Sequence, residues 1–157
     1  MKIEDKKKRK AVEHVVYEIM MFKATNLLLL SNINEQVSKN VLLESFAVHS
    51  RNLFDFFYKK RINDDIVAID FIGNKAQFRK DKSKKRNMQT LARKANKQIS
   101  HLTYSRNNYN SRTKPWNISS IGAQMNKTIE AFFKSLDIEK KVWFNKELKK
   151  WNYPILL

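Results

Sequence analysis

Apolar residues recur every three or four positions over four long segments of this chain, and this spacing predicts four helices. The segments cover about residues 10–30, 33–58, 87–106 and 116–136. A shorter C-terminal piece, rich in tryptophan, predicts one or two further short helices that dock through their rings. The pattern therefore indicates a chain that is helical over most of its length.

The boundaries and the gaps between these helices carry their own signals. Asn32 followed by Glu35 resembles a capping box that would open the second helix. Residues 59–87 show no clear period, and the run IVAIDF at 66–71 is too short to classify. We expect this part to be an irregular insertion between the second and third helices.

Composition supports a helical fold in a single domain. Only two glycines and two prolines occur in 157 residues, and folds built on many tight turns need more of both. Hydrophobic residues make up 42% of the chain, enough for one sizeable core. We predict an all-α, four- to five-helix bundle over residues 1–157, with residues 1–9 forming a frayed basic arm.

Charge narrows the classes of partner. The formal net charge is +17, and such an excess of positive charge attracts polyanions. Between Lys75 and Lys97 ten basic residues stand against one acid, Asp81. The candidate nucleic-acid contacts are Arg79, Lys80, Lys84, Lys85, Arg86, Arg93, Lys97 and Arg106. A merely solvated basic surface, or a face for an acidic protein, remains the alternative interpretation.

Several chemistries are disfavoured by what the chain contains. Without cysteine there is no disulfide, thiolate zinc site or cysteine nucleophile. Two glycines cannot build a phosphate-binding glycine loop, and the three histidines follow no metal-ligand spacing. We expect no cofactor, no metal and no membrane span, and a cytoplasmic location.

The stretch NKQISHLTYSR at 96–106 keeps one chemistry open, which is metal-free cleavage of RNA. RNA carries its own nucleophile in the 2′-hydroxyl, so an enzyme needs only to move protons and stabilise a charged phosphorane. A histidine suits the first task, and an arginine or amide donor suits the second. His101 at the border of an apolar helix face is a candidate for this role, although structural packing is the competing interpretation.

The helix 87–106 resembles the signature helix of the HEPN superfamily. The usual motif there is Arg, a polar residue, three further residues and His, and here Asn96, Lys97 and His101 occupy those positions. The stretch VLLESFAVHSRNLFDFF at 41–57 is similar to a helix that precedes the motif in several HEPN-like proteins. The resemblance implies a small all-α domain, a homodimer and, in many members, a metal-independent endoribonuclease of toxin–antitoxin or phage-defence systems.

The resemblance implies roles for two residues: His101 would act as general acid or base, and Asn96 would donate to the phosphate. Arg51, Arg93 and Arg106 are candidates, by position only, for the charge that the motif Arg normally brings. His49 lies on the apolar stripe of its helix, so it is either a hydrogen-bonded core histidine or a second lining residue of the same cleft. Arg51 and Asp55 form a candidate ion pair at i,i+4.

The resulting hypothesis is a HEPN-like protein that binds RNA and cleaves it without metal, with a neutralising antitoxin protein as a further expected partner. A non-catalytic nucleic-acid-binding module and a protein-interaction module are the alternatives. Tyr104, close to the basic run, is either a core residue or a stacking platform for bases.

Overall fold

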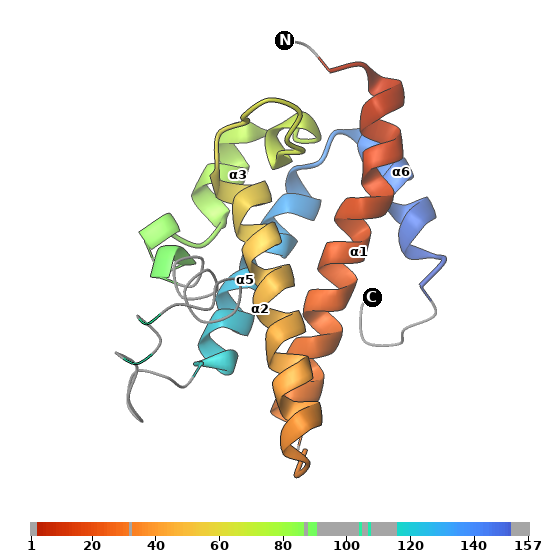
Figure 1. The fold of residues 1–157 in the computed structure, drawn as a ribbon. Coiled ribbons are helices and arrows are strands. Elements are labelled where there is room, and N and C mark those ends of the chain that lie inside the picture. The colour runs from red at the N-terminus through yellow and green to blue at the C-terminus, as the bar shows by residue number, and fades with distance from the viewer. Residues whose placement is uncertain are drawn as a thin grey trace.

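A computed structural model describes residues 3–31, 33–86, 88–90, 104, 107 and 116–151. These residues form an all-α fold, as the sequence predicts, and no strand occurs among them. Figure 1 shows the arrangement: two long antiparallel helices, α1 and α2, with the later helices packed along them. None of the described helices is both long and apolar enough to cross a membrane.

Helices α1 (Asp5–Leu30) and α2 (Gln36–Tyr58) form the long hairpin of the fold. Helix α1 begins at Asp5, so residues 5–9, part of the arm expected to be frayed, lie in its first turns. The predicted capping box is wrong, because Glu35 is itself the N-cap and accepts hydrogen bonds from the backbone N–H groups of Val37 and Ser38. A carboxylate in this position satisfies donors that the first helical turn leaves free.

Helices α5 (Ile118–Ser135) and α6 (Ile138–Leu148) pack against α1 on the other side of the core. Asn117 caps α5, because its side chain accepts from the backbone N–H of Ser120. Gly122 lets α5 approach α1 closely, since a Cβ atom there would collide with the side-chain amide of Asn26.

The segment between α2 and the basic run is more ordered than its sequence suggests. It contains a 3₁₀ turn (Ala68–Asp70), an isolated antiparallel bridge between Ile72 and Leu136, and helix α3 (Lys75–Asp81). Two buried rings, Phe71 and Phe78, anchor this segment to the core. The apolar content of IVAIDF therefore reflects packing and not a strand.

The core is a cluster of aromatic rings centred on Phe132, which is fully buried. Its ring lies 5.3 Å from Phe56 and 5.5 Å from Phe57 of α2, both in edge-to-face geometry. Phe78 of α3 and Phe144 of α6 lie 6.4 Å and 5.3 Å away. Aromatic pairs in such geometry add stabilisation beyond their buried area. One ring therefore ties together α2, α3, α5 and α6.

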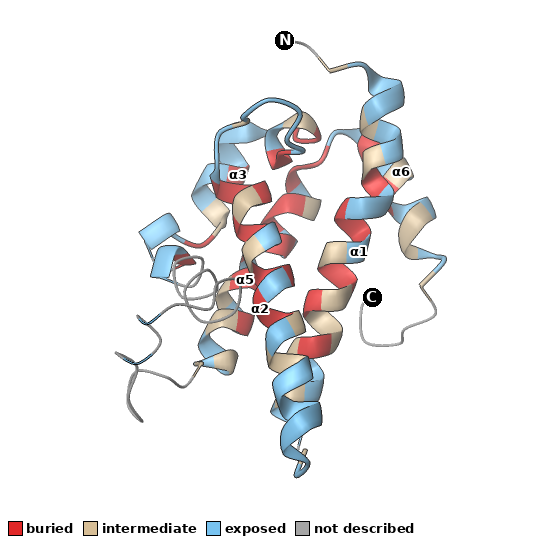
Figure 2. Ribbon diagram, viewed as in Figure 1, coloured by how far each residue is buried: buried red, intermediate tan, exposed pale blue. Residues whose placement is uncertain are grey.

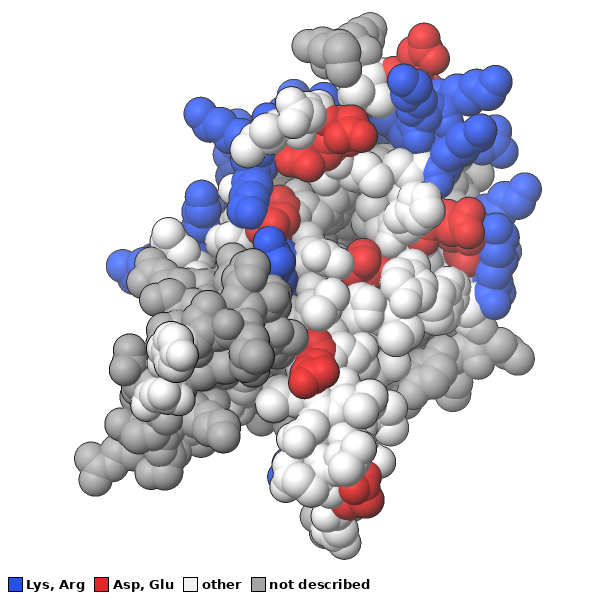
Figure 3. Space-filling model, viewed as in Figure 1, with Lys and Arg blue, Asp and Glu red and all other residues white. Residues whose placement is uncertain are grey.

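Burial is uneven along the hairpin. Figure 2 shows buried residues where α1 and α2 face the other helices, and mostly exposed residues toward the turn that joins them. Figure 3 shows that Lys and Arg gather over α3 and over the N-terminal half of α1 near α6, while the turn end of the hairpin is nearly free of them. On this face, the Lys and Arg side chains of the described residues are thus concentrated away from the turn end of the hairpin.

Candidate nucleic-acid interface

A concave basic surface lies where α3 and the residues after it meet α5. It encloses about 590 Å³, and we call it the basic pocket. Its lining residues are Arg79, Lys80, Lys82, Ser83, Lys84, Lys85, Arg86 and Lys127. Five of these are predicted nucleic-acid contacts, so the structure brings Arg79, Lys80, Lys84, Lys85 and Arg86 into one surface.

Helix α3 positions the first cations of the pocket. Asn74 caps the helix by accepting from the backbone N–H of Gln77 at 3.0 Å. Phe78 points into the core and is 3% exposed, which fixes the rotation of this short helix. Arg79 and Lys80 follow in the last turn and are exposed. Cations at a helix C-terminus are favoured by the helix dipole, so this placement does not strain the fold.

A buried polar network fixes the residues that follow α3. The hydroxyl of Tyr58 donates to the backbone oxygen of Ser83 at 2.8 Å and lies 2.9 Å from Oγ1 of Thr128. The Ser83 hydroxyl donates to the backbone oxygen of Gln124 at 3.0 Å, and the Ser83 N–H donates to Thr128 Oγ1 at 3.3 Å. Burial raises the pKa of Tyr58, which keeps the phenol protonated as this network requires. The network therefore holds the backbone of the basic pocket against α2 and α5.

Lys82 is the most enclosed cation of the pocket. Its ammonium group donates to the backbone oxygen of Phe57 at 3.1 Å and lies 4.5 Å and 4.7 Å from the ring centres of Tyr58 and Phe78. Burial, with the nearby charges of Arg79 and Lys85, lowers the pKa of Lys82 below its ordinary value. A bound anion would relieve this repulsion.

The cations of the pocket have no acidic partner among the described residues. Within the described part of the chain, no ion pair involves any of its seven lysines and arginines. The basic surface over α1 and α6 differs, because Lys8 and Lys140 pair with Asp5, and Lys150 pairs with Glu147. Unneutralised cations in a concavity produce a strong local positive potential. The basic pocket is therefore the better anion site of the two.

Lys127 is a site residue that sequence reasoning missed. It lies on α5, next to Thr128 of the polar network, and 41 residues after Arg86. Lys82 belongs to the basic run of the sequence, although it is not among the predicted contacts. Only the packing of α3 on α5 reveals that Lys127 belongs to the pocket.

His49 is buried at the α1–α2 interface. Its Nδ1 lies 2.7 Å from Oε2 of Glu18, and its ring meets Tyr17 edge-on at 5.5 Å. It is 7% exposed, so it occupies the hydrogen-bonded core position that was one of the two predictions. Its place in a catalytic cleft with His101 stays a prediction, because His101 lies outside the described residues.

Arg51 follows His49 by two residues and therefore lies about 200° around the same helix. The structure does not bring these two predicted catalytic side chains together. The expected Arg51–Asp55 ion pair is wrong, because Asp55 binds Lys59 at 2.6 Å. Lys59 lies one helical turn after Asp55, at the end of α2, where a cation is favoured.

Asn96 and His101, and the contacts Arg93, Lys97 and Arg106, also lie outside the described residues. Lys85, Arg86 and residues 88–90 are helical, which places the start of the expected helix 87–106 directly after the basic pocket. Tyr104 is 93% exposed and so is not a core residue. Across the described segments, no three His, Cys, Asp or Glu side chains cluster closely enough to hold a metal ion.

No protein-family model, curated protein or solved structure matches this chain.

Proposed function

We propose that this protein binds RNA through the basic pocket. The observation that supports it is the convergence of seven cationic residues from α3, its following segment and α5, none of them paired with an acid in the described structure. Polyanion affinity depends mainly on such cations, because each phosphate contact releases condensed counterions.

The pocket is built in advance of binding. The Tyr58–Ser83–Thr128 network and the buried Phe78 fix its backbone, so an incoming phosphate chain need not order it. Less ordering on binding means a smaller entropy cost for each phosphate that is bound. This distinguishes the pocket from a collection of independently moving surface lysines.

Fluorescence anisotropy of a labelled single-stranded RNA, titrated at several salt concentrations, tests the proposal. The pocket variant replaces Arg79, Lys80, Lys84, Lys85 and Arg86 by Gln. We expect its affinity to fall by about 100-fold or more, and the slope of log affinity against log salt to shrink by about 0.7 for each phosphate that is no longer neutralised. A matched control variant replaces five exposed cations on the other basic surface, namely Lys6, Lys7, Arg9, Lys10 and Lys149, by Gln.

The two variants carry the same net charge, so their difference reports the position of the cations. Equal reductions in affinity in both would show that net charge alone drives binding, and would contradict the proposal. Preferential binding of DNA, or displacement of RNA by polyglutamate at matched charge, would instead favour the alternatives of a DNA-binding or acidic-protein-binding module.

Cleavage of RNA is the second part of the hypothesis, and it rests on the HEPN resemblance of Asn96 and His101. His49 is paired with Glu18 and enclosed, and Arg51 lies on another face of α2, so the described residues favour binding over catalysis. Incubation of RNA with the protein in EDTA tests cleavage. The activity is expected to be lost in His101→Ala with RNA affinity retained. Cleavage that survives this substitution would contradict the assigned role.

The biological setting follows from the same resemblance. A homodimer, a neutralising antitoxin protein, a cytoplasmic location and a role in a toxin–antitoxin or phage-defence system are all part of this proposal. Light scattering with and without RNA tests the first of these expectations.

A further inference from the structure

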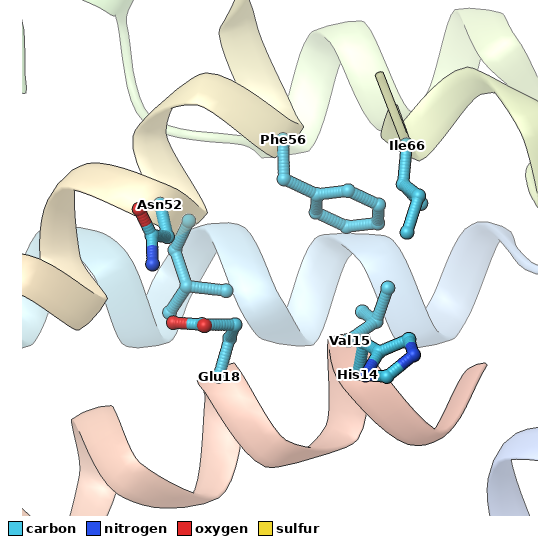
Figure 4. A pocket seen from close by; sticks show the side chains of 7 residues that line it. His14, Val15, Glu18, Asn52, Phe56 and Ile66 are labelled. Atoms are coloured by element: carbon cyan, nitrogen blue, oxygen red, sulfur yellow. The ribbon is translucent and has the colours of Figure 1, made fainter. Parts of the chain in front are cut away.

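A second cavity, of about 200 Å³, lies between α1 and α2 and has a different chemistry from the basic pocket. Figure 4 shows it from close by, with the Glu18 carboxyl group and the Asn52 amide at one end and the Phe56 ring, Ile66 and His14 toward the other. Val15 and Leu53 complete its lining. We call it the carboxylate cavity.

Among the described residues of this lining, Glu18 is the only one with a full negative charge, and none is a Lys or Arg. One carboxylate oxygen is held by His49 Nδ1 at 2.7 Å, whereas the other has no hydrogen bond to any described residue. The side chain of Glu18 is 25% exposed, so it is partly withdrawn from water. A carboxylate in this setting favours a ligand that brings positive charge and N–H donors.

The apolar walls of the cavity determine the size and polarity of the part of the ligand that is not charged. Val15, Leu53 and Phe56 are buried core residues, and Ile66 lies at the exposed rim. A dry apolar cavity of about 150 Å³ holds one benzene molecule. The carboxylate cavity is somewhat larger, with room for one ring and a short polar group.

We propose that the carboxylate cavity binds a small organic cation, namely a primary amine or amidine with an apolar body. The ammonium group donates to the free oxygen of Glu18, and the body packs against Phe56 and Leu53. This site does not depend on the proposed RNA binding, since its charge repels phosphate.

Methyl NMR of the Val, Leu and Ile residues, titrated at constant ionic strength, tests the proposal with three probes of nearly the same shape. Benzylamine is expected to shift the methyl signals of Val15, Leu53 and Ile66 to saturation. Benzyl alcohol is expected to bind about 10-fold more weakly or worse, because it lacks the charge-assisted hydrogen bond. Benzoate is expected to give no shift of these signals.

Glu18→Gln keeps the shape of the side chain and removes its charge. We expect benzylamine affinity to fall by about 10-fold and benzyl alcohol affinity to stay within about twofold. Glu44→Gln is the matched control, because Glu44 is an exposed carboxylate on α2 that does not line the cavity. Ile66→Trp at the exposed rim provides a second test, since it blocks the cavity without burying new volume in the core.

The proposal is overturned if benzylamine leaves the cavity methyl signals unmoved, if the three probes bind equally, or if Glu18→Gln leaves benzylamine affinity unchanged. Binding of benzylamine that persists in Ile66→Trp would also overturn it, because the ligand would then lie elsewhere.

Discussion

The basic pocket and the carboxylate cavity both lie at the C-terminal end of α2, but their linings carry opposite charge. Asn52, Leu53 and Phe56 line the cavity, while Phe57 and Tyr58 contact Lys82 of the pocket. Among the described residues, the lining of the pocket contains cations and no acid, and the lining of the cavity contains one carboxylate and no lysine or arginine. In a chain with a net charge of +17, the distribution of charges is thus more informative than their sum.

The two sites are supported by the same aromatic core. The largest loss of stability is therefore expected from a substitution at the centre of that core. Phe132→Ala removes the ring that contacts both Phe56 and Phe57, and truncation of a buried Phe costs about 3–5 kcal/mol. Urea unfolding should show this decrease in stability, and both sites should weaken together. Phe133→Ala, at a half-buried neighbouring position, is the control and should cost clearly less. Equal decreases would contradict the central place of Phe132.

A change to the polar network is expected to weaken the basic pocket and leave the carboxylate cavity unchanged. Tyr58→Phe removes the hydroxyl that serves the Ser83 backbone oxygen and Thr128, at a cost of about 1–3 kcal/mol for the buried group left unpaired. RNA affinity should fall because the pocket loses its fixed backbone, whereas benzylamine binding to the cavity should not change. Unchanged RNA affinity in a folded Tyr58→Phe protein would show that the network does not position the pocket.

Lys127 tests whether the pocket extends to α5. Lys127→Gln should lower RNA affinity by about threefold to 10-fold at low salt and reduce the salt slope by about 0.7. Lys134→Gln, also exposed on α5 but not part of the pocket lining, is the matched control. Anisotropy titrations of both variants measure the difference, and equal effects would remove Lys127 from the site.

Lys82 gives the smallest expected effect, which is a change in pH dependence. Its pKa is lowered by burial and by Arg79 and Lys85, so its ammonium group loses its proton at a lower pH than a lysine of ordinary pKa. RNA affinity should therefore begin to fall at a pH below the ordinary lysine range. Lys82→Arg keeps its charge and should flatten this part of the profile. Parallel profiles for the two proteins would exclude Lys82 as a contributing cation.

Much of the fold follows from apolar periodicity. The long helices α1, α2 and α5 have apolar faces that repeat over five turns or more, and a tertiary fold has little freedom to override such patterns. Helix α3 escaped prediction because it has seven residues and a single apolar anchor, Phe78, too little for a period to be visible.

The candidate site was only half visible in the sequence. Charge density along the chain identified the cations from Arg79 to Arg86, since they are neighbours in sequence. Lys127 joins them only through packing, and the Glu18–His49 pair joins residues 31 positions apart. The position of His49 on the apolar face of its helix predicted burial. It did not indicate which carboxylate would be its hydrogen-bonding partner.

Lysine acetylation footprinting with and without RNA tests the central claim most directly. We predict that bound RNA protects Lys80, Lys84, Lys85 and Lys127 from acetylation, while Lys6, Lys7, Lys10 and Lys149 stay reactive. Equal protection on both basic surfaces, or protection confined to α1 and α6, would contradict binding of RNA through the basic pocket.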